Sequence, residues 1–213
     1  MSIKFDNSQA AFEKIYDDLN KNGIPFGGTK CFFNYGFEIL NPLDRDINVD
    51  FRGWKKEYAE YEWKWYLSED PSAVEISKKA QIWKRCMDED GRVNSNYGYQ
   101  WSRGDQIKYV IDELTKNPVS RRASISIYDA KDRHNFENDT PCTYAIHFYL
   151  LKDMLNMSVM MRSNDLWYGF CNDQYCFSRL QEVISSAIGR PVGSYYHFVN
   201  NIHIYERHFD KNI

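Results

Sequence analysis

Hydrophobic side chains repeat every three or four positions in three segments of the first half of the chain. Residues 8–22 have this spacing, and Gly23 follows them as a C-terminal cap. Residues 50–67 carry aromatic side chains at the same spacing, and residues 105–116 carry aliphatic ones, with Pro118 just beyond. The pattern therefore predicts three amphipathic helices that each pack one face on a core.

The pattern then changes to a period of two, which is typical of strands. Residues 123–128 alternate Ser and Ile. Two apolar runs, residues 144–151 and 155–161, flank the polar pair Lys152–Asp153, as in a β-hairpin. These three segments are therefore predicted to be strands.

Near the end of the chain, residues 173–188 return to helical spacing, and residues 194–205 are rich in Tyr, Val, Ile and His. Helices first and strands later predict an α+β fold with a mainly antiparallel or mixed sheet. A length of 213 residues fits one domain over residues 1–213.

Composition narrows the possible partners. Lys and Arg total 27 against 30 Asp and Glu, a net charge of −3, which argues against a broad basic surface for nucleic acid. A phosphate group on a ligand would therefore be bound by a few basic side chains at one site rather than by the surface as a whole. Aromatic residues make up 16% of the chain, which suits either a core of large side chains or a pocket for a flat ligand.

The cysteines indicate a reducing compartment. The five are scattered without a CxxC pair: Cys31, Cys86, Cys142, Cys171 and Cys176. The N-terminus has no apolar core of signal-peptide length, and no apolar run is long enough to cross a membrane. A cytoplasmic protein with reduced thiols is expected, and one thiol could be a nucleophile.

Three arginines and a serine are candidate anion ligands. Arg121 and Arg122 are adjacent before a predicted strand, and Arg162 is followed by Ser163 at the end of another. Guanidinium groups bind phosphate oxygens bidentately, and a hydroxyl adds a donor. The alternative is that these are solvated arginines at strand ends.

Other candidates also have two interpretations. Cys142 lies between a loop and a strand, where it is either a nucleophile or a small buried hydrophobe. Asp173 begins a predicted helix as an N-cap or as a ligand group. His203 and Tyr205 share one face of a strand. No cluster has zinc-ligand spacing, so no metal is expected.

Several short motifs occur in a characteristic order. They are Glu60–Trp63, Ile82–Trp83, Asn94–Trp101, Asp105–Gln106, Asn117–Arg122, Pro141–Thr143, Met161–Asp165, Gly169–Asp173 and His203–Tyr205. This series resembles the thymidylate synthase superfamily over about residues 50 to 208. The resemblance implies a thymidylate synthase-like three-layer fold whose mixed sheet forms a two-fold dimer interface.

Within that superfamily, the chain looks most like the phage-type deoxycytidylate 5-hydroxymethylases. Thr143 follows the cysteine where synthases usually have His, and Met161 stands where they have Gln before Arg-Ser. Asp173 replaces the asparagine that reads uracil in the synthases. A carboxylate accepts from the N4 amine of cytosine, and in protonated form it serves N3. Asp173 is therefore interpreted as a cytosine selector.

The resemblance implies a folate-dependent reaction on dCMP or CMP. Cys142 would add to C6 of the pyrimidine, and C5 would take the one-carbon unit of the co-substrate 5,10-methylenetetrahydrofolate. Elimination of tetrahydrofolate leaves an exocyclic methylene, to which water adds to give 5-hydroxymethyl. Glu60 would organise water and proton transfers, and Tyr97 would assist proton removal.

The resemblance also assigns binding residues. Trp83 would border the base and the folate, and Asp165 would contact the folate ring. His203 and Tyr205 would contact the 3′-hydroxyl of the sugar. The nearest candidate for an N-terminal phosphate loop is Gly27–Lys30.

For the phosphate itself, Arg162 and Ser163 would be joined by Arg121 and Arg122 from the other subunit of a homodimer. Such an enzyme would serve nucleotide biosynthesis and DNA modification in the cytoplasm of a bacterial or phage-infected cell. One alternative is C5 methylation of dCMP or dUMP by hydride addition. Another is a noncatalytic nucleotide- or RNA-binding relative, against which Cys142, Glu60 and Tyr97 argue.

Overall fold

A computed structural model describes residues 3–131 and 138–211. Its strands are β1 (Ile3–Phe5), β2 (Ile24–Phe26), β3 (Thr29–Ile39), β4 (Ser124–Ser126), β5 (Thr143–Leu151), β6 (Met154–Met161), β7 (Asn164–Asp165) and β8 (Val192–Tyr205). Its α-helices are α1 (Ser8–Asn22), α2 (Lys56–Leu67), α3 (Ile82–Cys86), α4 (Tyr97–Ser102), α5 (Gln106–Lys116) and α6 (Cys171–Ala187). A π-helical turn, Leu166–Phe170, precedes α6.

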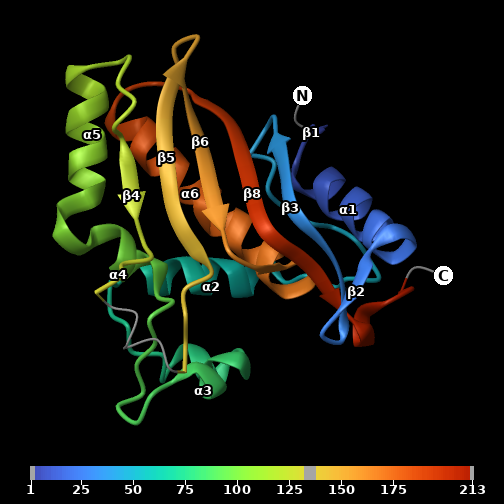
Figure 1. The fold of residues 1–213 in the computed structure, drawn as a ribbon. Coiled ribbons are helices and arrows are strands. Elements are labelled where there is room, and N and C mark those ends of the chain that lie inside the picture. The colour runs from blue at the N-terminus through green and yellow to red at the C-terminus, as the bar shows by residue number, and fades with distance from the viewer. Residues whose placement is uncertain (1–2, 132–137, 212–213) are drawn as a thin grey trace.

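The described strands form one mixed sheet in the order β1-β3-β8-β6-β5-β4, with β2 beside β3 and β7 beside β8 (Figure 1). Strand β8 runs parallel to β6 and β7 and antiparallel to β3. Helix α6 makes the crossover between β7 and β8 behind the sheet. The expected α+β fold with a mixed sheet is confirmed.

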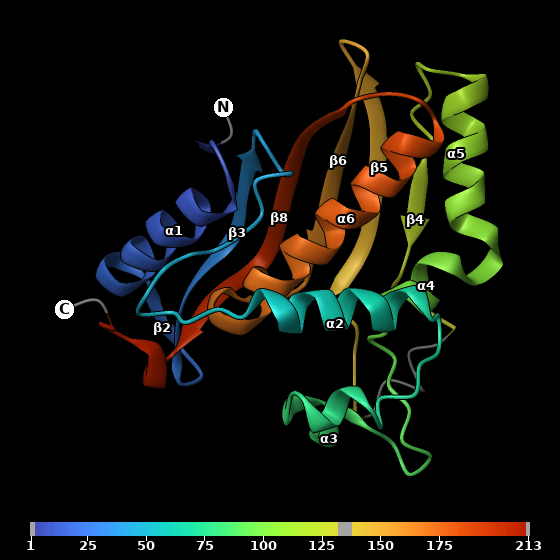
Figure 2. The ribbon, with the colours of Figure 1, turned by 180° about the vertical axis from the view of Figure 1, so that it is seen from behind.

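The helices lie on one face of this sheet (Figures 1 and 2). Along β5, Ile146 and Phe148 are fully buried towards the helices. His147 and Tyr149 alternate with them on the opposite face, where their rings stack 6.0 Å apart. That opposite face is covered by no helix of the described residues.

Helix α1 has the bounds that its periodicity predicts. The Asn7 side chain accepts a hydrogen bond from the Ala10 amide, and the Gly23 amide bonds to the Leu19 carbonyl. The apolar face predicted for the core is fully buried: Ala11, Phe12, Ile15, Tyr16 and Leu19. The predicted hairpin is also confirmed as β5 and β6, with Lys152 and Asp153 both at positive φ, as a tight two-residue turn requires.

Two predictions are wrong. Helix α2 begins at Lys56 rather than near residue 50, because the chain turns at Gly53, whose φ is +55°. Strands do not all follow the helices, since β3 is a long N-terminal strand paired with β8. Its alternation of apolar and polar positions is broken by Asn34 at positive φ and by Gly36, where a Cβ would lie 2.2 Å from the Tyr196 hydroxyl.

No helix within residues 3–131 and 138–211 combines the length and apolar character needed to cross a membrane.

Gly98 lets α4 approach the end of α2. A Cβ at this position would lie 1.6 Å from the Tyr66 carbonyl oxygen, which is backbone and cannot turn aside. Overpacking that side chains can absorb costs about 1–3 kcal/mol, so we expect Gly98→Ala to cost about 3 kcal/mol or more. The melting temperature should fall by roughly 6 °C or more.

The matched control is Gly104→Ala, a position at φ +66° with open space around it. Backbone strain alone should cost that variant about 1–2 kcal/mol. Equal melting temperatures for the two variants, measured by circular dichroism, would show that Gly98 is not needed for this contact.

Candidate functional site

Several of the predicted site residues lie where strands β5 to β8 start or finish at the same end of the sheet. Because β5 and β6 are antiparallel, the start of β5 lies beside the end of β6, and the Arg162 amide donates to the Cys142 carbonyl at 2.7 Å. Strand β7 continues from this point beside β8, where Asp165 is the register partner of His203. The strand pairing therefore brings four of these residues to one end of the sheet: Cys142, Arg162, Asp165 and His203.

The Arg162 guanidinium lies against the Cys142 thiol. Its Nη2 is 3.6 Å from Sγ, and its Nε and Nη2 also donate to the carbonyls of Pro141 and Thr140. Burial raises the pKa of the Cys142 thiol to about 11, while the Arg162 charge opposes that rise. Ser163 is the next residue, and its side chain is half-buried. The thiol is thus protonated in the unliganded protein, with one positive charge placed to favour the thiolate.

Asp173, in the first turn of α6, is hydrogen-bonded to the buried Asn164. Asn164 Nδ2 donates to Asp173 Oδ2 at 2.7 Å. Gly169 permits this contact, since a Cβ there would lie 2.8 Å from Asn164 Nδ2 and 3.4 Å from Asp173 Oδ2. Burial raises the pKa of Asp173 to about 7, although the hydrogen bond from Asn164 lowers it. The carboxyl is therefore close to half-protonated at neutral pH.

Glu62 is a buried carboxyl that sequence reasoning missed. Tyr66 donates its hydroxyl to Glu62 Oε1 at 3.0 Å, and Glu62 Oε2 is buried with no hydrogen-bond partner among the described residues. Burial, and then the charge of Asp173, raise the pKa of Glu62 to about 8. An unpaired buried acceptor is costly unless a ligand or water completes it. Glu62 thus has an acceptor open to a ligand, and it lies within electrostatic reach of Asp173.

The structure does not bring Glu60 into this group. Glu60 is exposed on α2 and accepts a hydrogen bond from Tyr175 at 3.4 Å. Residues two apart on a helix do not share a face, so Glu62 points inward where Glu60 cannot. The signal in the sequence was that Glu62 falls in the apolar stripe of α2, three residues after Ala59 and four before Tyr66.

The two predicted aromatic residues differ in their relation to the acids. Tyr97 is buried at the start of α4, and burial, followed by the charges of Cys142 and Asp173, raises the pKa of its hydroxyl. Trp83 donates from Nε1 to the Tyr58 hydroxyl at 2.9 Å, and the charge of Glu62 contributes to a raised pKa of Tyr58. Tyr97 therefore interacts with Asp173 directly, whereas Trp83 is connected to Glu62 through Tyr58.

The end of β8 supplies a second group. Burial raises the pKa of Asp165, whereas the nearby His203 lowers it, and Asp165 Oδ1 accepts from the Trp167 amide at 2.9 Å. The rings of His203 and Tyr205 meet edge to face at 5.3 Å. The predicted pairing of these two residues on β8 is observed.

Arg121 and Arg122 lie elsewhere in this chain. Both are exposed before β4, and Arg122 pairs with Glu113 at 2.9 Å. The Ala123 carbonyl bonds to the Phe148 amide, so the arginines lie six or more residues along β5 from Cys142, roughly 20 Å at the rise of a strand. One chain alone does not place them in the site.

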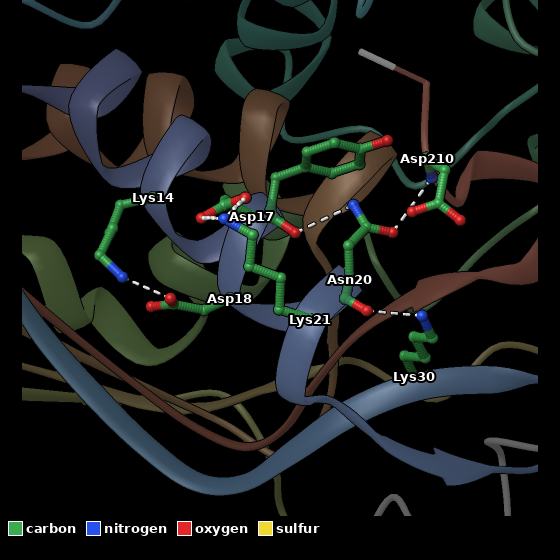
Figure 3. Close-up of polar contacts among 8 residues, drawn as sticks. Lys14, Asp17, Asp18, Asn20, Lys21, Lys30 and Asp210 are labelled. Atoms are coloured by element: carbon green, nitrogen blue, oxygen red, sulfur yellow. Dashed lines mark hydrogen bonds and ion pairs between the residues drawn. The ribbon is translucent and has the colours of Figure 1, made fainter. Parts of the chain in front are cut away.

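The segment Gly27–Lys30 includes the turn between β2 and β3, and its lysine is already engaged. Lys30 Nζ donates to the Asn20 carbonyl at 2.6 Å and lies 4.7 Å from the centre of the Phe209 ring. Figure 3 shows Lys30 directed to the end of α1, where Asn20 also accepts from the Asp210 amide. Within residues 3–131 and 138–211, no cluster of three or more His, Cys, Asp or Glu could hold a metal ion.

Comparison with known proteins adds independent evidence. A family model described as "Thymidylate synthase" matches residues 51–212. A thymidylate synthase of Bacillus licheniformis is 30% identical over 167 residues, 74% of this chain and 60% of that protein. The enzyme of Bacillus phage phi3T is 29% identical, with the same shares covered. One from Fusobacterium nucleatum is 28% identical over 96% of this chain and 83% of its own. The matched part thus spans about 60% of the length of the Bacillus licheniformis and phage phi3T enzymes.

The buried acids make stability depend on pH. Their raised pKa values mean that these two groups hold protons in the native protein that the unfolded chain releases, so the stability that they contribute falls as pH rises from about 5 to 8. Asp173→Asn removes one ionisation. Its stability relative to wild type should therefore increase between pH 5 and pH 8, and each pKa unit is worth about 1.4 kcal/mol, or several degrees of melting temperature. If the difference in melting temperature between Asp173→Asn and wild type is the same at pH 5 and at pH 8, this prediction is contradicted.

Proposed function

This chain belongs to the thymidylate synthase family, and we propose that it hydroxymethylates C5 of a cytidine monophosphate, dCMP or CMP. The one-carbon donor is 5,10-methylenetetrahydrofolate, consumed as a co-substrate. The observation that carries the proposal is the Cys142 thiol beside the Arg162 guanidinium, within electrostatic reach of the Asp173 carboxyl, which Asn164 holds by a hydrogen bond.

The preference for cytosine follows from the hydrogen-bonding capacity of Asp173. Cytosine presents an amine at N4 and an unprotonated N3, whereas uracil presents O4 and an N3–H. A carboxyl with a pKa near 7 accepts from N4 with one oxygen and, when protonated, donates to N3 with the other. A buried mismatch costs about 1–3 kcal/mol. The bond from Asn164 to Asp173 Oδ2 holds the carboxyl in one orientation.

The reaction begins when the Cys142 sulfur forms a bond to C6 and the ring electrons move to C5. C5 then bonds to the one-carbon unit as one of the two C–N bonds that hold this unit to the folate breaks, and C5 loses its proton. The second C–N bond then breaks, which releases tetrahydrofolate and gives an exocyclic methylene at C5. Water adds its oxygen to that methylene, and the electrons return through the ring to expel Cys142. The net change at C5 is replacement of a hydrogen by CH2OH.

Glu62 is the best-placed group for the proton and water steps. Its pKa of about 8 lets it both hold and release a proton near neutral pH, and its Oε2 has no hydrogen-bond partner in the described part of the chain. Tyr97 has a buried hydroxyl close to both Cys142 and Asp173. These two residues would guide the C5 proton and the attacking water.

The phosphate requires charge that one chain supplies only in part. Two nitrogens of Arg162 bind backbone carbonyls, so its remaining N–H groups and the Ser163 hydroxyl are available to a phosphate. Arg121 and Arg122 would complete the site from a second copy, joined across the face of the sheet that holds His147 and Tyr149. A site built this way needs the homodimer for turnover.

The second candidate is methylation of dUMP. It is favoured by the relatives, which are named thymidylate synthases. The two reactions share the attack by Cys142 and diverge at the exocyclic methylene, which takes either water or hydride. Asp173 favours the cytosine substrate.

Product mass distinguishes the candidates. We expect dCMP with methylenetetrahydrofolate to gain the mass of CH2O, and dUMP to give little product. Cys142→Ser should lower turnover about 10³-fold or more while nucleotide binding is retained, because only the nucleophile is lost. The matched control is Cys86→Ser, a second half-buried thiol. A gain of CH2 on dUMP alone would favour the methylation candidate.

Asp173→Asn should move base preference from cytosine towards uracil. The ratio of kcat/KM for dCMP to that for dUMP should fall by about 5- to 150-fold, the equivalent of about 1–3 kcal/mol. Asp105→Asn is the control, because Asp105 lies outside the site at a positive φ that Asn tolerates. A ratio that is unchanged in Asp173→Asn would rule out Asp173 as the selector.

A further inference from the structure

The segment that leads into Cys142 is held from two opposite sides. On one side, Arg162 donates to the carbonyls of Thr140 and Pro141. On the other side, Asp139 turns its carboxyl towards the loop before α4. The nucleophile therefore depends on contacts to both sides for its position, because its own β-strand begins only at Thr143.

The contact between Asp139 and Ser95 is close and buried. Asp139 is only 9% exposed. Its Oδ2 accepts from the Ser95 amide at 2.6 Å, and its Oδ1 accepts from the Ser95 hydroxyl at 2.7 Å. Asn94 Nδ2 donates to the Asp139 carbonyl at 3.0 Å, which adds a third bond between the two segments.

The loop that receives Asp139 is itself anchored. Gln100 donates to the Asn94 carbonyl at 2.7 Å, and Asn96 donates to the carbonyls of Trp65 and Asp70. The Asn96 side chain also accepts from the Tyr99 amide, so it caps α4. Tyr97 begins that helix two residues after Ser95. Asp139 thus connects the nucleophile to the frame that holds Tyr97.

We propose that Asp139 is a positioning residue, which acts through Ser95 to fix Cys142 relative to Tyr97. This inference rests on the proposed function, in which those two side chains act on one pyrimidine ring. Asp139 does not touch the substrate. Its effect is to keep the sulfur and the phenol in the geometry that attack at C6 requires.

Electrostatics argue that Asp139 acts by position rather than by activating the thiol. A negative charge beside a thiol disfavours the thiolate, and Asp139 contributes to the raised pKa of Cys142. Burial raises the pKa of Asp139 itself, against the bonds from Ser95. The Asp139 carboxyl therefore disfavours the Cys142 thiolate and is itself desolvated, and its favourable effect is the contact with Ser95.

This distinction gives a test with two opposite readouts. In Asp139→Ala, kcat should fall at least tenfold while KM for the nucleotide changes by less than about threefold. Alkylation of Cys142 by iodoacetamide, followed by mass spectrometry, should become faster, because the segment loosens and a negative charge is removed. Ser95→Ala should lower kcat to a smaller extent, and the double variant should be no worse than Asp139→Ala, since both remove one contact.

Asp88→Ala is the matched control. Asp88 also accepts two backbone amides in a loop, from Asp90 and Arg92, but it is exposed and bonds to neither segment of the contact. If Asp139→Ala fails to fold, Asp139→Asn and Ser95→Ala carry the same test. A kcat within twofold of wild type, or alkylation that is not accelerated, would overturn the inference. A wild-type protein inactive on both dCMP and dUMP would refute the proposed function instead, while alkylation would still report on the contact.

Discussion

The desolvated pair of acids, Glu62 and Asp173, is the constraint on which the rest of the site depends. Burial raises the pKa of each carboxyl; the charge of Asp173 adds to the rise at Glu62, and the charge of Asp165 adds to the rise at Asp173. The fold offsets part of this cost with one hydrogen bond from Asn164 and one from Tyr66. What remains is a site that holds protons near neutral pH and has buried acceptors open to a ligand, which is a suitable environment for acid–base chemistry on a polar ring.

The architecture explains how these groups meet. Antiparallel pairing of β5 and β6 places Cys142 beside Arg162, and β7 then carries the chain to the end of β8. The π-helical turn before α6 brings Asp173 back against Asn164, at a point where a Cβ at position 169 would press on the Asn164 amide. Segments far apart in the sequence therefore contribute one functional group each. The end of a sheet is well suited to this, because pairing fixes the strand ends while the loops beyond them present side chains.

The sequence predicted those parts of the fold that local periodicity determines. Helix α1 and the β5–β6 hairpin have strong amphipathic patterns and a clear cap or turn, and their bounds agree with the structure. Strand β3 was missed because Asn34 and Gly36 interrupt its pattern. For the site, the motifs identified Cys142, Arg162 and Asp173 as neighbours, but Glu60 was chosen over Glu62, a choice that depends on which face of α2 is buried. Arg121 and Arg122 lie far from Cys142 within one chain, a separation that depends on how β4 pairs with β5 and that local periodicity does not report.

Release of tritium from C5 is the most direct measurement of the central claim, that the Cys142 sulfur attacks a ring whose amine is bound by Asp173. The protein is incubated with methylenetetrahydrofolate and either [5-³H]dCMP or [5-³H]dUMP, and tritiated water is counted. The account predicts rapid release from dCMP and slow release from dUMP. Rapid release from dUMP with none from dCMP would contradict the assignment of Asp173, and no release from either would contradict the attack itself.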